Sequence, residues 1–395
     1  MNILMIARGY PTPKEPQRGC FEQDQAEALQ RYGHKVIVAS VDGRFRWQFR
    51  RIGITTYEKD NVLYYNSFLL PSKIMSLFGG RKFAKKIMAY QLDKIYKLVV
   101  DKYGKPDVIY AHFFFNTLMG SFLKRKYSIP LVGIEHAGRF RFDHLDPNTL
   151  KDAKAAYEQT DAIITVSESL RKGLYHHFQK ESFVVPNITA NVFEKTNITS
   201  PPQCDDLIFV SVGRLVKSKR FDLLIQSFGQ INKSLKNWKL NIIGPGEEKD
   251  NLQQLIDNNG LQDKIHLLGP KTKSEIADIF SKSLIFVLAS QLETFGVVYI
   301  EAMSMGLPVI ATICGGPEDF VNQSNGLLVP IDDVKALTNA IKFLYENYSH
   351  YDRIRISTEC RHKFSSTTIV RQLTEVFEGV IERNNSNLKD CANIQ

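Results

Sequence analysis

The sequence has few cysteines, and none of them is spaced like a metal ligand pair. No Cys-x-x-Cys pair occurs among the five, which are Cys20, Cys204, Cys314, Cys360 and Cys391. An odd and scattered set of cysteines indicates neither a disulfide framework nor a zinc site. It is typical of a protein that works in a reducing compartment.

Long apolar runs and Gly-x-Gly-x-x-Gly loops are also missing. No stretch approaches the roughly 18 apolar residues that a membrane span needs. The apolar run at residues 3–7 is too short for a signal sequence and has no basic residues before it. We therefore expect a cytoplasmic protein. Because the first loop is long and proline-rich where dinucleotide-binding domains carry the glycine motif, a dehydrogenase is disfavoured.

The apolar residues that are present predict two α/β domains. A chain of 395 residues is too long for one ordinary core, and its 43% hydrophobic and 24% charged residues are typical of a globular protein. Short apolar runs alternate with longer amphipathic ones, which is the pattern of parallel sheets covered by helices. The expected strands are residues 2–7, 35–41, 107–112, 131–135, 162–166 and 183–185, then 207–212, 239–243, 265–268, 284–289, 309–311 and 327–329.

These two sets of strands predict two Rossmann-like domains in tandem. The break is expected within residues 187–206, which contain two adjacent prolines and no periodic pattern. A final helix is expected at residues 367–383, followed by a disordered polar tail at 384–395.

The most informative stretch of the chain begins at Glu293 and ends at Glu301. An apolar, strand-like run precedes it and a helix-compatible run follows, so Glu293 should lie at the mouth of a helix. Eight positions are a little over two helical turns, which puts both carboxylates on nearly one face. The helix is expected to begin with Phe295, Gly296 and Val297. Their N–H groups have no partner within the helix and could bind a phosphate. The carboxylates would accept hydrogen bonds from sugar and ribose hydroxyls; the alternative is a pair of solvated helix glutamates.

Two cations flank the loop after the strand expected at 207–212. Arg214 and Lys219 stand at the carboxyl end of that strand, where open parallel sheets bind their ligands. Together they could neutralise a diphosphate, Arg214 as a bidentate fork and Lys219 as a point charge. The alternative is two ordinary surface charges on a loop.

Together these residues resemble the retaining glycosyltransferases of family 4, which have the GT-B fold. The resemblance extends over residues 205–345 and rests on the order and spacing of residues 213–215, Lys219, Glu293, Glu301, 315–318 and 325–330. It implies two Rossmann-like domains that face each other across a cleft. The acceptor-binding domain would be residues 1–190 and the donor-binding domain residues 191–365. Residues 366–395 would carry a helix that crosses back to the first domain.

The resemblance also implies roles for individual residues. Arg214 and Lys219 would bind the donor diphosphate, Glu293 the hydroxyls of the donor sugar and Glu301 the ribose, while the base would sit near Gly269. Two departures from the family pattern occur. Arg220 stands where the family usually has glycine, and the segment 186–191 lacks the glycine that is usual at the hinge.

In the first half, a histidine and a glycine are the expected site residues. His136 follows the strand at 131–135 and so lies at the sheet edge that should face the cleft. The resemblance places a histidine there, and we expect it to hydrogen-bond the donor sugar rather than act as a nucleophile. His112 ends a strand in the same way. Gly19, just before the helix at 21–31, either lets the backbone approach a phosphate or simply forms a turn.

Charge is unevenly distributed along the chain. Residues 1–190 hold 29 Lys and Arg against 18 Asp and Glu, whereas the remainder holds 22 against 24. The excess indicates an anionic partner for the first domain. Arginines alternate with aromatic residues at 44–51, and cations mix with apolar residues at 73–97. These segments suit peripheral contact with an anionic membrane surface, and no nucleic-acid-binding motif is present. The alternatives are an anionic or diphosphate-linked acceptor and, for residues 73–97, a helix with a core face and a basic outer face.

The predicted activity is retaining transfer of a sugar from a nucleotide-diphosphate sugar to an acceptor hydroxyl. The chain has no Asp-x-Asp sequence, so we expect no metal and no cofactor, with cations and a helix N-terminus stabilising the leaving diphosphate. The expected acceptor is a saccharide, lipid-linked or a surface-polysaccharide intermediate. The alternatives are a nucleotide-sugar epimerase of the same architecture and a non-catalytic protein that binds nucleotide sugars.

Overall fold

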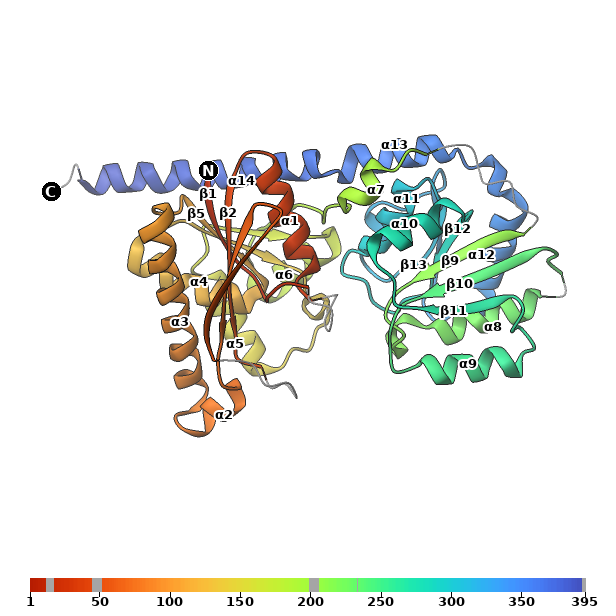
Figure 1. The fold of residues 1–395 in the computed structure, drawn as a ribbon, viewed down its shortest axis with the longest axis horizontal. Helices are drawn as coiled ribbons and strands as arrows, with labels where there is room; N and C mark the ends of the chain where they lie inside the picture. The colour runs from red at the N-terminus through yellow and green to blue at the C-terminus, as the bar shows by residue number, and fades with distance from the viewer. Residues whose placement is uncertain (12–17, 45–51, 199–205, 233, 393–395) are drawn as a thin grey trace. The chain divides into compact units, whose positions relative to one another are not determined.

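The computed structural model describes residues 1–11, 18–44, 52–198, 206–232 and 234–392, with side chains as far as residue 386. The chain forms two compact units (Figure 1). One consists of Met1–Asn187 together with Thr367–Gln395, and the other of Ile188–Ser366. No described helix is both long enough and apolar enough to cross a membrane.

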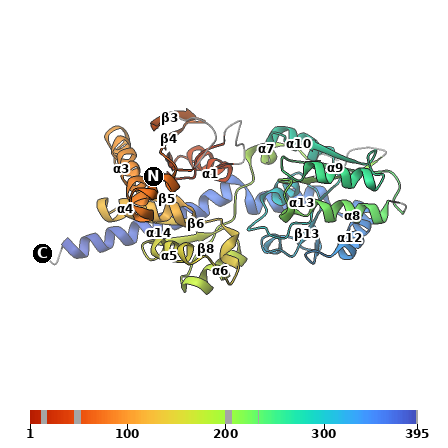
Figure 2. The ribbon, with the colours of Figure 1, turned by 90° about the horizontal axis from the view of Figure 1, so that it is seen from below.

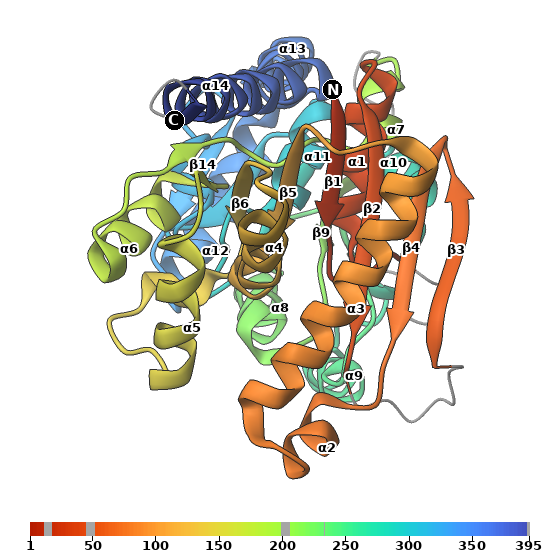
Figure 3. The ribbon, with the colours of Figure 1, turned by 90° about the vertical axis from the view of Figure 1, so that its left-hand side faces the viewer.

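The first unit is built on an eight-stranded sheet with the order β3-β4-β2-β1-β5-β6-β7-β8. All neighbours are parallel except β3 and β4, which pair antiparallel at one edge (Figure 3). β8 lies at the opposite edge, near α6 (Glu168–Phe178) (Figure 2). The strands are β1 (Asn2–Ile6), β2 (Lys35–Asp42), β3 (Gly53–Lys59), β4 (Val62–Phe68), β5 (Val108–His112), β6 (Leu131–Glu135), β7 (Ala162–Thr165) and β8 (Phe183–Val184).

Helices bury both faces of this sheet, as its almost wholly apolar inner strands require. On one face, α3 (Gly80–Tyr103) and α4 (Phe113–Tyr127) share a buried core with β1, β2 and β5, and Ala156 of α5 (Pro147–Tyr157) joins it. On the other, the ring of Phe377 in α14 (Ser366–Ala392) meets Tyr110 of β5 at 5.0 Å. α1 (Cys20–Arg31) follows β1, and a short helix, α2 (Ser72–Leu77), precedes α3.

The second unit is a six-stranded, wholly parallel sheet with the order β11-β10-β9-β12-β13-β14. Its strands are β9 (Leu207–Val212), β10 (Trp238–Ile243), β11 (Ile265–Gly269), β12 (Ile285–Leu288), β13 (Val309–Thr312) and β14 (Gly326–Val329). Its helices are α7 (Asn191–Lys195), α8 (Phe221–Ile231), α9 (Lys249–Asn258), α10 (Lys273–Ser281), α11 (Val297–Ser304), α12 (Val334–Asn347) and α13 (Arg353–Phe364). Because parallel strands end at one edge, the loops after them meet there.

Two Rossmann-like sheets confirm the predicted fold class, and all twelve expected strands are present with ends shifted by at most one residue. Two expectations about elements were wrong. The hairpin β3–β4 was missed, although Asp60 and Asn61 have positive φ angles of 51° and 61°, as a two-residue hairpin turn requires. The tail expected to be disordered from residue 384 is helical as far as Ala392.

Candidate functional site

Four loops converge at the carboxyl edge of the sheet in the second unit. Their backbones touch so closely that side chains are excluded: a Cβ on Gly244, after β10, would lie 1.9 Å from the carbonyl oxygen of Gly213, after β9. A Cβ on Gly316, after β13, would lie 2.3 Å from the carbonyl oxygen of Phe295. Gly244 was not among the predicted site residues, although a Gly-Pro-Gly sequence directly after an expected strand marks such a close approach.

Two predicted donor-binding residues meet in this edge. Lys219, from the loop after β9, pairs with the Oε1 atom of Glu293, from the loop after β12, at 2.5 Å. The Ser290 hydroxyl donates to the same oxygen at 2.8 Å. The side chains of Lys219 and Glu293 are 22% and 11% exposed, so the pair is largely removed from water. A cation and a carboxylate are thus held together where a ligand of the sheet would enter.

Arg214 and Arg220 differ in what surrounds them. Arg214 is exposed, and the described residues include no hydrogen-bond or ion-pair partner for its side chain. Arg220 pairs with Asp222 at 3.1 Å and with Asp332. Its φ of 49° is left-handed, a conformation that glycine adopts without cost and that costs other residues roughly 1–2 kcal/mol. The backbone therefore explains why glycine is usual at this position, and the two aspartates compensate the added charge.

The helix after β12 begins later than predicted. Gly296 caps α11 with a φ of 91°, and Val297 is its first residue. Phe295 does not open the helix, because its side chain is 2% exposed and packs against Phe320 and Phe364 at 5.3 and 5.7 Å. Only the backbone of Phe295 is therefore available for the predicted contact. Glu301 lies within α11 and is half-buried.

Gly269 ends β11 on the same edge of the sheet. Its φ is 69°, and nothing lies within 4 Å of where a Cβ would stand. Its carbonyl oxygen accepts a hydrogen bond from the N–H of Gly244 at 2.9 Å. The structure thus gathers the loops that carry Arg214, Lys219, Glu293 and Gly269 at one edge. No group of three or more His, Cys, Asp or Glu side chains in the described parts of the chain could hold a metal ion.

In the first unit, His136 follows β6 and lies against His112, the last residue of β5. The rings stack with centroids 5.3 Å apart, and the Nδ1 atom of His112 is 3.2 Å from the Nε2 atom of His136. Burial lowers the pKa of His112 to about 4 and that of His136 well below its usual value. Both imidazoles are therefore neutral near pH 7, one donating to the other.

An ion pair between the half-buried Arg8 and the buried Glu22, beside the histidines, was missed. The Arg8 guanidinium donates to both carboxylate oxygens of Glu22 at 2.7 and 3.1 Å, and it lies 4.0 Å from the ring centroid of Phe113. Burial opposes ionisation of Glu22, but the Arg8 hydrogen bond and charge prevail and lower its pKa to about 2. The signal in the sequence was a charged residue just after the first strand and another in the first turn of the next helix.

Two further residues of this unit hold loops in place. Gly19 caps α1 with a φ of 70°, and a Cβ there would lie 2.3 Å from the carbonyl oxygen of Gly9, so the tight turn itself requires glycine. Glu135 accepts hydrogen bonds from the N–H groups of Phe114, His136 and Ala137 and from the Tyr157 hydroxyl, at 2.7–2.9 Å. It therefore fixes the loop that carries His136.

Comparison with known protein families identifies both halves of the chain. Residues 193–359 match the model of glycosyl transferases group 1, and residues 23–189 match that of glycosyltransferase family 4. The chain belongs to the family 4 glycosyltransferases. These enzymes transfer a sugar from a nucleotide sugar, which agrees with the predicted family and class of activity.

Curated relatives of this glycosyltransferase are distant in sequence. An exopolysaccharide phosphotransferase of Streptomyces coelicolor is 29% identical over 56% of this chain and 24% of its own length. An uncharacterised glycosyltransferase of Methanocaldococcus jannaschii is 27% identical over 91% of this chain and 97% of its own. The chain thus spans about a quarter of the first relative and nearly all of the second.

Solved structures show the same fold at low identity. A sucrose-phosphate synthase from Thermosynechococcus elongatus has a TM-score of 0.78 and 19% identity, over 97% of this chain and all of its own. HepE from Anabaena, in complex with UDP, has a TM-score of 0.75 and 18% identity, over 96% of this chain and 100% of its own. It was also solved with UDP-glucose. The lipopolysaccharide outer core galactosyltransferase WaaB has a TM-score of 0.72 and 17% identity, over 96% and 99%. The glycosyltransferase described here therefore has the GT-B fold.

Proposed function

We propose that this glycosyltransferase moves a sugar, with retention and without a metal, from a nucleotide-diphosphate sugar to a hydroxyl of a lipid-linked or surface-polysaccharide intermediate. The observation that carries the proposal is the pairing of Lys219 with Glu293 at the carboxyl edge of the second sheet, with the exposed Arg214 on the same loop as Lys219. A cation for phosphate and a carboxylate for sugar hydroxyls are the two groups that a nucleotide-sugar donor needs.

When the donor binds, Lys219 would contact its diphosphate and Glu293 would contact its sugar. The diphosphate attracts Lys219 and Arg214, and the N–H groups at the start of α11 provide further donors for an anion. Glu293 would then accept hydrogen bonds from the sugar in place of the contact with Lys219. In the transition state, negative charge grows on the leaving diphosphate, and the same cations and dipoles are already in place to stabilise it. No metal is needed for this step in our proposal.

The nucleoside would occupy the other side of the same edge. We assign Glu301 to the ribose and the open space beside Gly269 to the base. HepE, which shares the fold, was solved with UDP-glucose, and this supports a uridine nucleotide as the first donor to test. Backbone groups of Phe295, Gly296 and Val297 are assigned to the diphosphate, and the backbone at Gly19 is assigned to a ligand phosphate.

His136 is assigned to the donor sugar. Its pKa lies well below the usual value because burial disfavours the charged ring, so near neutral pH it offers a neutral hydrogen-bonding group. A neutral imidazole can bind a sugar hydroxyl without competing for the diphosphate. This agrees with a positioning or transition-state contact rather than with nucleophilic attack.

The acceptor is assigned from the charge of the first unit. Its sequence is strongly cationic, and relatives that share the family or fold include an exopolysaccharide phosphotransferase and a lipopolysaccharide galactosyltransferase. We propose an anionic, lipid-linked glycan, reached by peripheral association with the inner face of the cell membrane from the cytoplasm. No nucleic-acid partner is proposed.

Product analysis with a panel of radiolabelled nucleotide sugars tests the proposal. Membrane lipid extract serves as the acceptor source, and the expected result is label transferred to the lipid fraction in the presence of a chelator. Conversion of the nucleotide sugar to its epimer would support the epimerase instead. Binding without turnover of any donor would support the non-catalytic alternative, and loss of transfer on chelation would contradict metal independence.

A further inference from the structure

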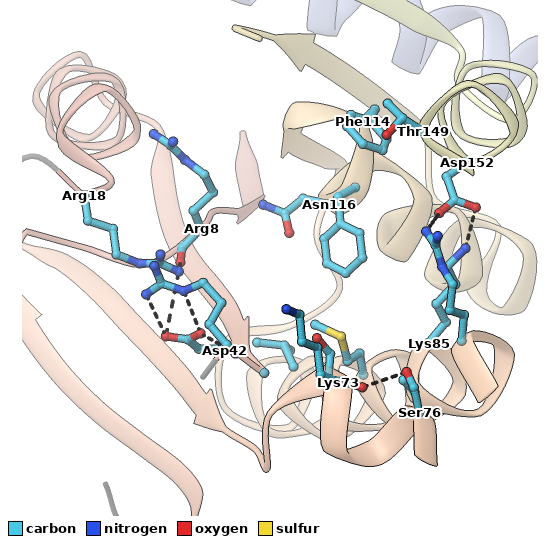
Figure 4. A pocket seen from close by; sticks show the side chains of 18 residues that line it. Arg8, Arg18, Asp42, Lys73, Ser76, Lys85, Phe114, Asn116, Thr149 and Asp152 are labelled. Carbon is cyan, nitrogen blue, oxygen red and sulfur yellow. Dashed lines mark hydrogen bonds and ion pairs between the residues drawn. The ribbon is translucent and has the colours of Figure 1, made fainter. Parts of the chain in front are cut away.

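A cavity of about 540 Å³ opens within the first unit, at the carboxyl ends of β1, β2 and β5 (Figure 4). Its walls come from the loops after β1 and β2, from α2 and α3, and from the first turns of α4 and α5. A volume of this size is in the range of small-molecule sites. The carboxyl edge is also where a Rossmann-like sheet binds its ligands.

The cavity wall has an excess of positive charge. Six cations line it, Arg8, Arg18, Arg44, Lys73, Arg81 and Lys85, against two carboxylates, Asp42 and Asp152. Each carboxylate is shared by two cations: Asp42 by Arg44 at 3.0 Å and Arg18 at 3.7 Å, and Asp152 by Arg81 at 3.1 Å and by Lys85. Lys73 has no carboxylate partner among the described residues. The lining side chains therefore carry an excess of four positive charges, one of which, that of Arg8, is balanced by Glu22 outside the cavity.

A buried amide faces the same space. Asn116, in the first turn of α4, is 7% exposed, and no described residue provides a hydrogen-bond partner for its side chain. Figure 4 shows its amide directed into the cavity, with Lys73 on the opposite wall. The amide is accessible from the cavity, although the residue as a whole is buried, so it is available to hydrogen-bond a ligand there.

Apart from the hydroxyl groups of Ser72, Ser76 and Thr149, the remaining side chains of the wall are mostly apolar. Val41, Ala84, Met88, Phe114 and Phe115 form the apolar part, between the cations on either side. An inorganic ion needs no such surface. The combination favours an organic ligand with one strongly anionic group and an apolar or sugar-like portion.

We propose that this cavity binds the phosphoryl group of the acceptor, a phosphate or diphosphate ester, and holds the attached chain against the apolar wall. This inference rests on the proposed function and names the chemistry of its acceptor. A phosphate ester carries up to about two negative charges, which suits a wall with an excess of four better than a single carboxylate does. Arg8 lines the cavity and also pairs with Glu22 beside His112 and His136, so the bound ester would lie next to the histidine pair.

Calorimetric titration of the whole protein with geranyl phosphate, glucose 1-phosphate, geraniol and geranic acid tests the site. Geranyl phosphate represents a lipid phosphate ester and glucose 1-phosphate a soluble one. The compound that binds with the lower Kd shows which kind of ester the cavity prefers. Geraniol, which lacks the anion, is expected not to bind. Failure of both phosphates to bind, or equal binding of geranic acid, would overturn the proposal.

Variants locate the binding within the cavity. Lys73→Ala and Asn116→Ala are each expected to weaken phosphate-ester binding about ten-fold, since one charge-assisted or buried hydrogen bond is lost. Lys86→Ala, an exposed lysine next to Lys85 on α3 that does not line the cavity, is the matched control and keeps full affinity. Equal losses in Lys73→Ala and Lys86→Ala would show a diffuse charged surface and overturn the site.

Titration of the same variants with UDP separates this inference from the donor assignment. Lys73→Ala should keep wild-type UDP affinity, while Lys219→Ala should lose UDP affinity and keep that for the phosphate ester. Unchanged UDP affinity in Lys219→Ala would undermine the proposed function alone. Unchanged ester affinity in both Lys73→Ala and Asn116→Ala would overturn the cavity assignment alone.

Discussion

At the scale of single residues, the donor site depends on how Lys219 is shared. In the structure Lys219 neutralises Glu293, whereas Arg214 has no described partner to give up. Donor binding must therefore draw Lys219 away from a carboxylate but can engage Arg214 directly. Replacing Lys219 should therefore affect both stability and ligand binding, whereas replacing Arg214 should affect ligand binding alone.

We expect Lys219→Ala and Arg214→Ala each to weaken UDP binding by roughly ten- to hundred-fold, the effect of losing one charge-assisted hydrogen bond. Lys219→Ala should also lower the melting temperature, because it leaves the largely buried Glu293 without its cation. Arg214→Ala should not. Calorimetry and thermal melts measure both effects, and Lys217→Ala on the same loop is the control. Normal UDP affinity in either variant would remove that cation from the diphosphate site.

The two glutamates should have opposite effects on turnover and on nucleotide affinity. Glu293→Gln is expected to reduce turnover much more than UDP affinity, because it acts at the sugar end of the donor. Glu301→Ala should reduce UDP affinity, because it removes the ribose contact. Kinetics with the identified donor and titration with UDP give the two quantities. A Glu301 variant that binds UDP normally would contradict the ribose assignment.

The histidine pair makes stability depend on pH. Burial lowers the folded-state pKa of His112 to about 4, so between pH 6.5 and 4 the unfolded chain binds more protons than the folded one. Stability contributed by this group is therefore present above pH 6.5 and is lost as the pH falls to 4, by at most about 3 kcal/mol. The free energy of unfolding, measured with urea at several pH values in this range, should fall less steeply with decreasing pH in His112→Gln than in the wild type. His176→Gln, at an exposed position, is the control; an unchanged slope in His112→Gln would be the contrary result.

The residues that the sequence assigns to the donor site stand close to strand ends, and the structure places their loops at one edge of the second sheet. Motif order assigned Lys219 and Glu293 separately, to the diphosphate and to the sugar, and the structure shows that their side chains form an ion pair. Arg8 and Glu22 could not be assigned in this way, since fourteen positions separate them and only the packing of α1 on the sheet joins them. For Phe295 the sequence indicated the position at the start of the helix but not that the side chain is buried in the core.

At the scale of elements, apolar runs located most of the buried strands but missed β3 and β4, although β4 is largely buried. β3 was missed because its side chains are mostly exposed or half-buried and give no continuous apolar run. The end of α14 was missed for a related reason. Residues 384–387 are all polar, so the sequence indicates no helix there, yet α14 continues to Ala392.

Phe377 tests how strongly α14 is held by the first unit. Its side chain is fully buried and packs edge-on against Tyr110, whose side chain is also fully buried. We expect Phe377→Ala to lower the free energy of unfolding by about 3–5 kcal/mol, the usual effect of emptying a buried aromatic site. Phe343→Ala on α12, where the ring is 48% exposed, is the matched control and should cost much less. Equal effects in denaturant melts would show that α14 is only loosely packed.

At the scale of the whole molecule, the sequence divides charge unequally between its halves, and the exposed apolar residues of the first unit lie beside that charge. Leu77 and Phe78, at the end of α2, are 82% and 77% exposed, and Phe83 in α3 is 42% exposed. Arg81, Lys82 and Lys86 follow on α3 and are exposed as well. The other predicted basic and aromatic patch, at 44–51, lies outside the described residues from position 45 onward.

Exposed apolar side chains next to cations suit the interface of an anionic membrane, where the apolar groups insert and each cation adds on the order of 1 kcal/mol. We therefore expect the wild-type protein to sediment with vesicles that contain anionic lipid and to bind neutral vesicles poorly. Added salt should weaken the binding, because exposed charges are screened over about 8 Å at physiological ionic strength.

The double variant Leu77→Ser, Phe78→Ser should lose most vesicle binding, because it removes the inserting groups and leaves every cation in place. Ile354→Ser, an equally polar change at a 62% exposed position in the second unit, is the control. Both proteins should keep wild-type UDP affinity, since neither change touches the donor-site loops. If the double variant sediments as the wild type does, insertion of α2 is excluded. The cationic excess of the first half would then act through the phosphate-ester cavity rather than through the membrane surface.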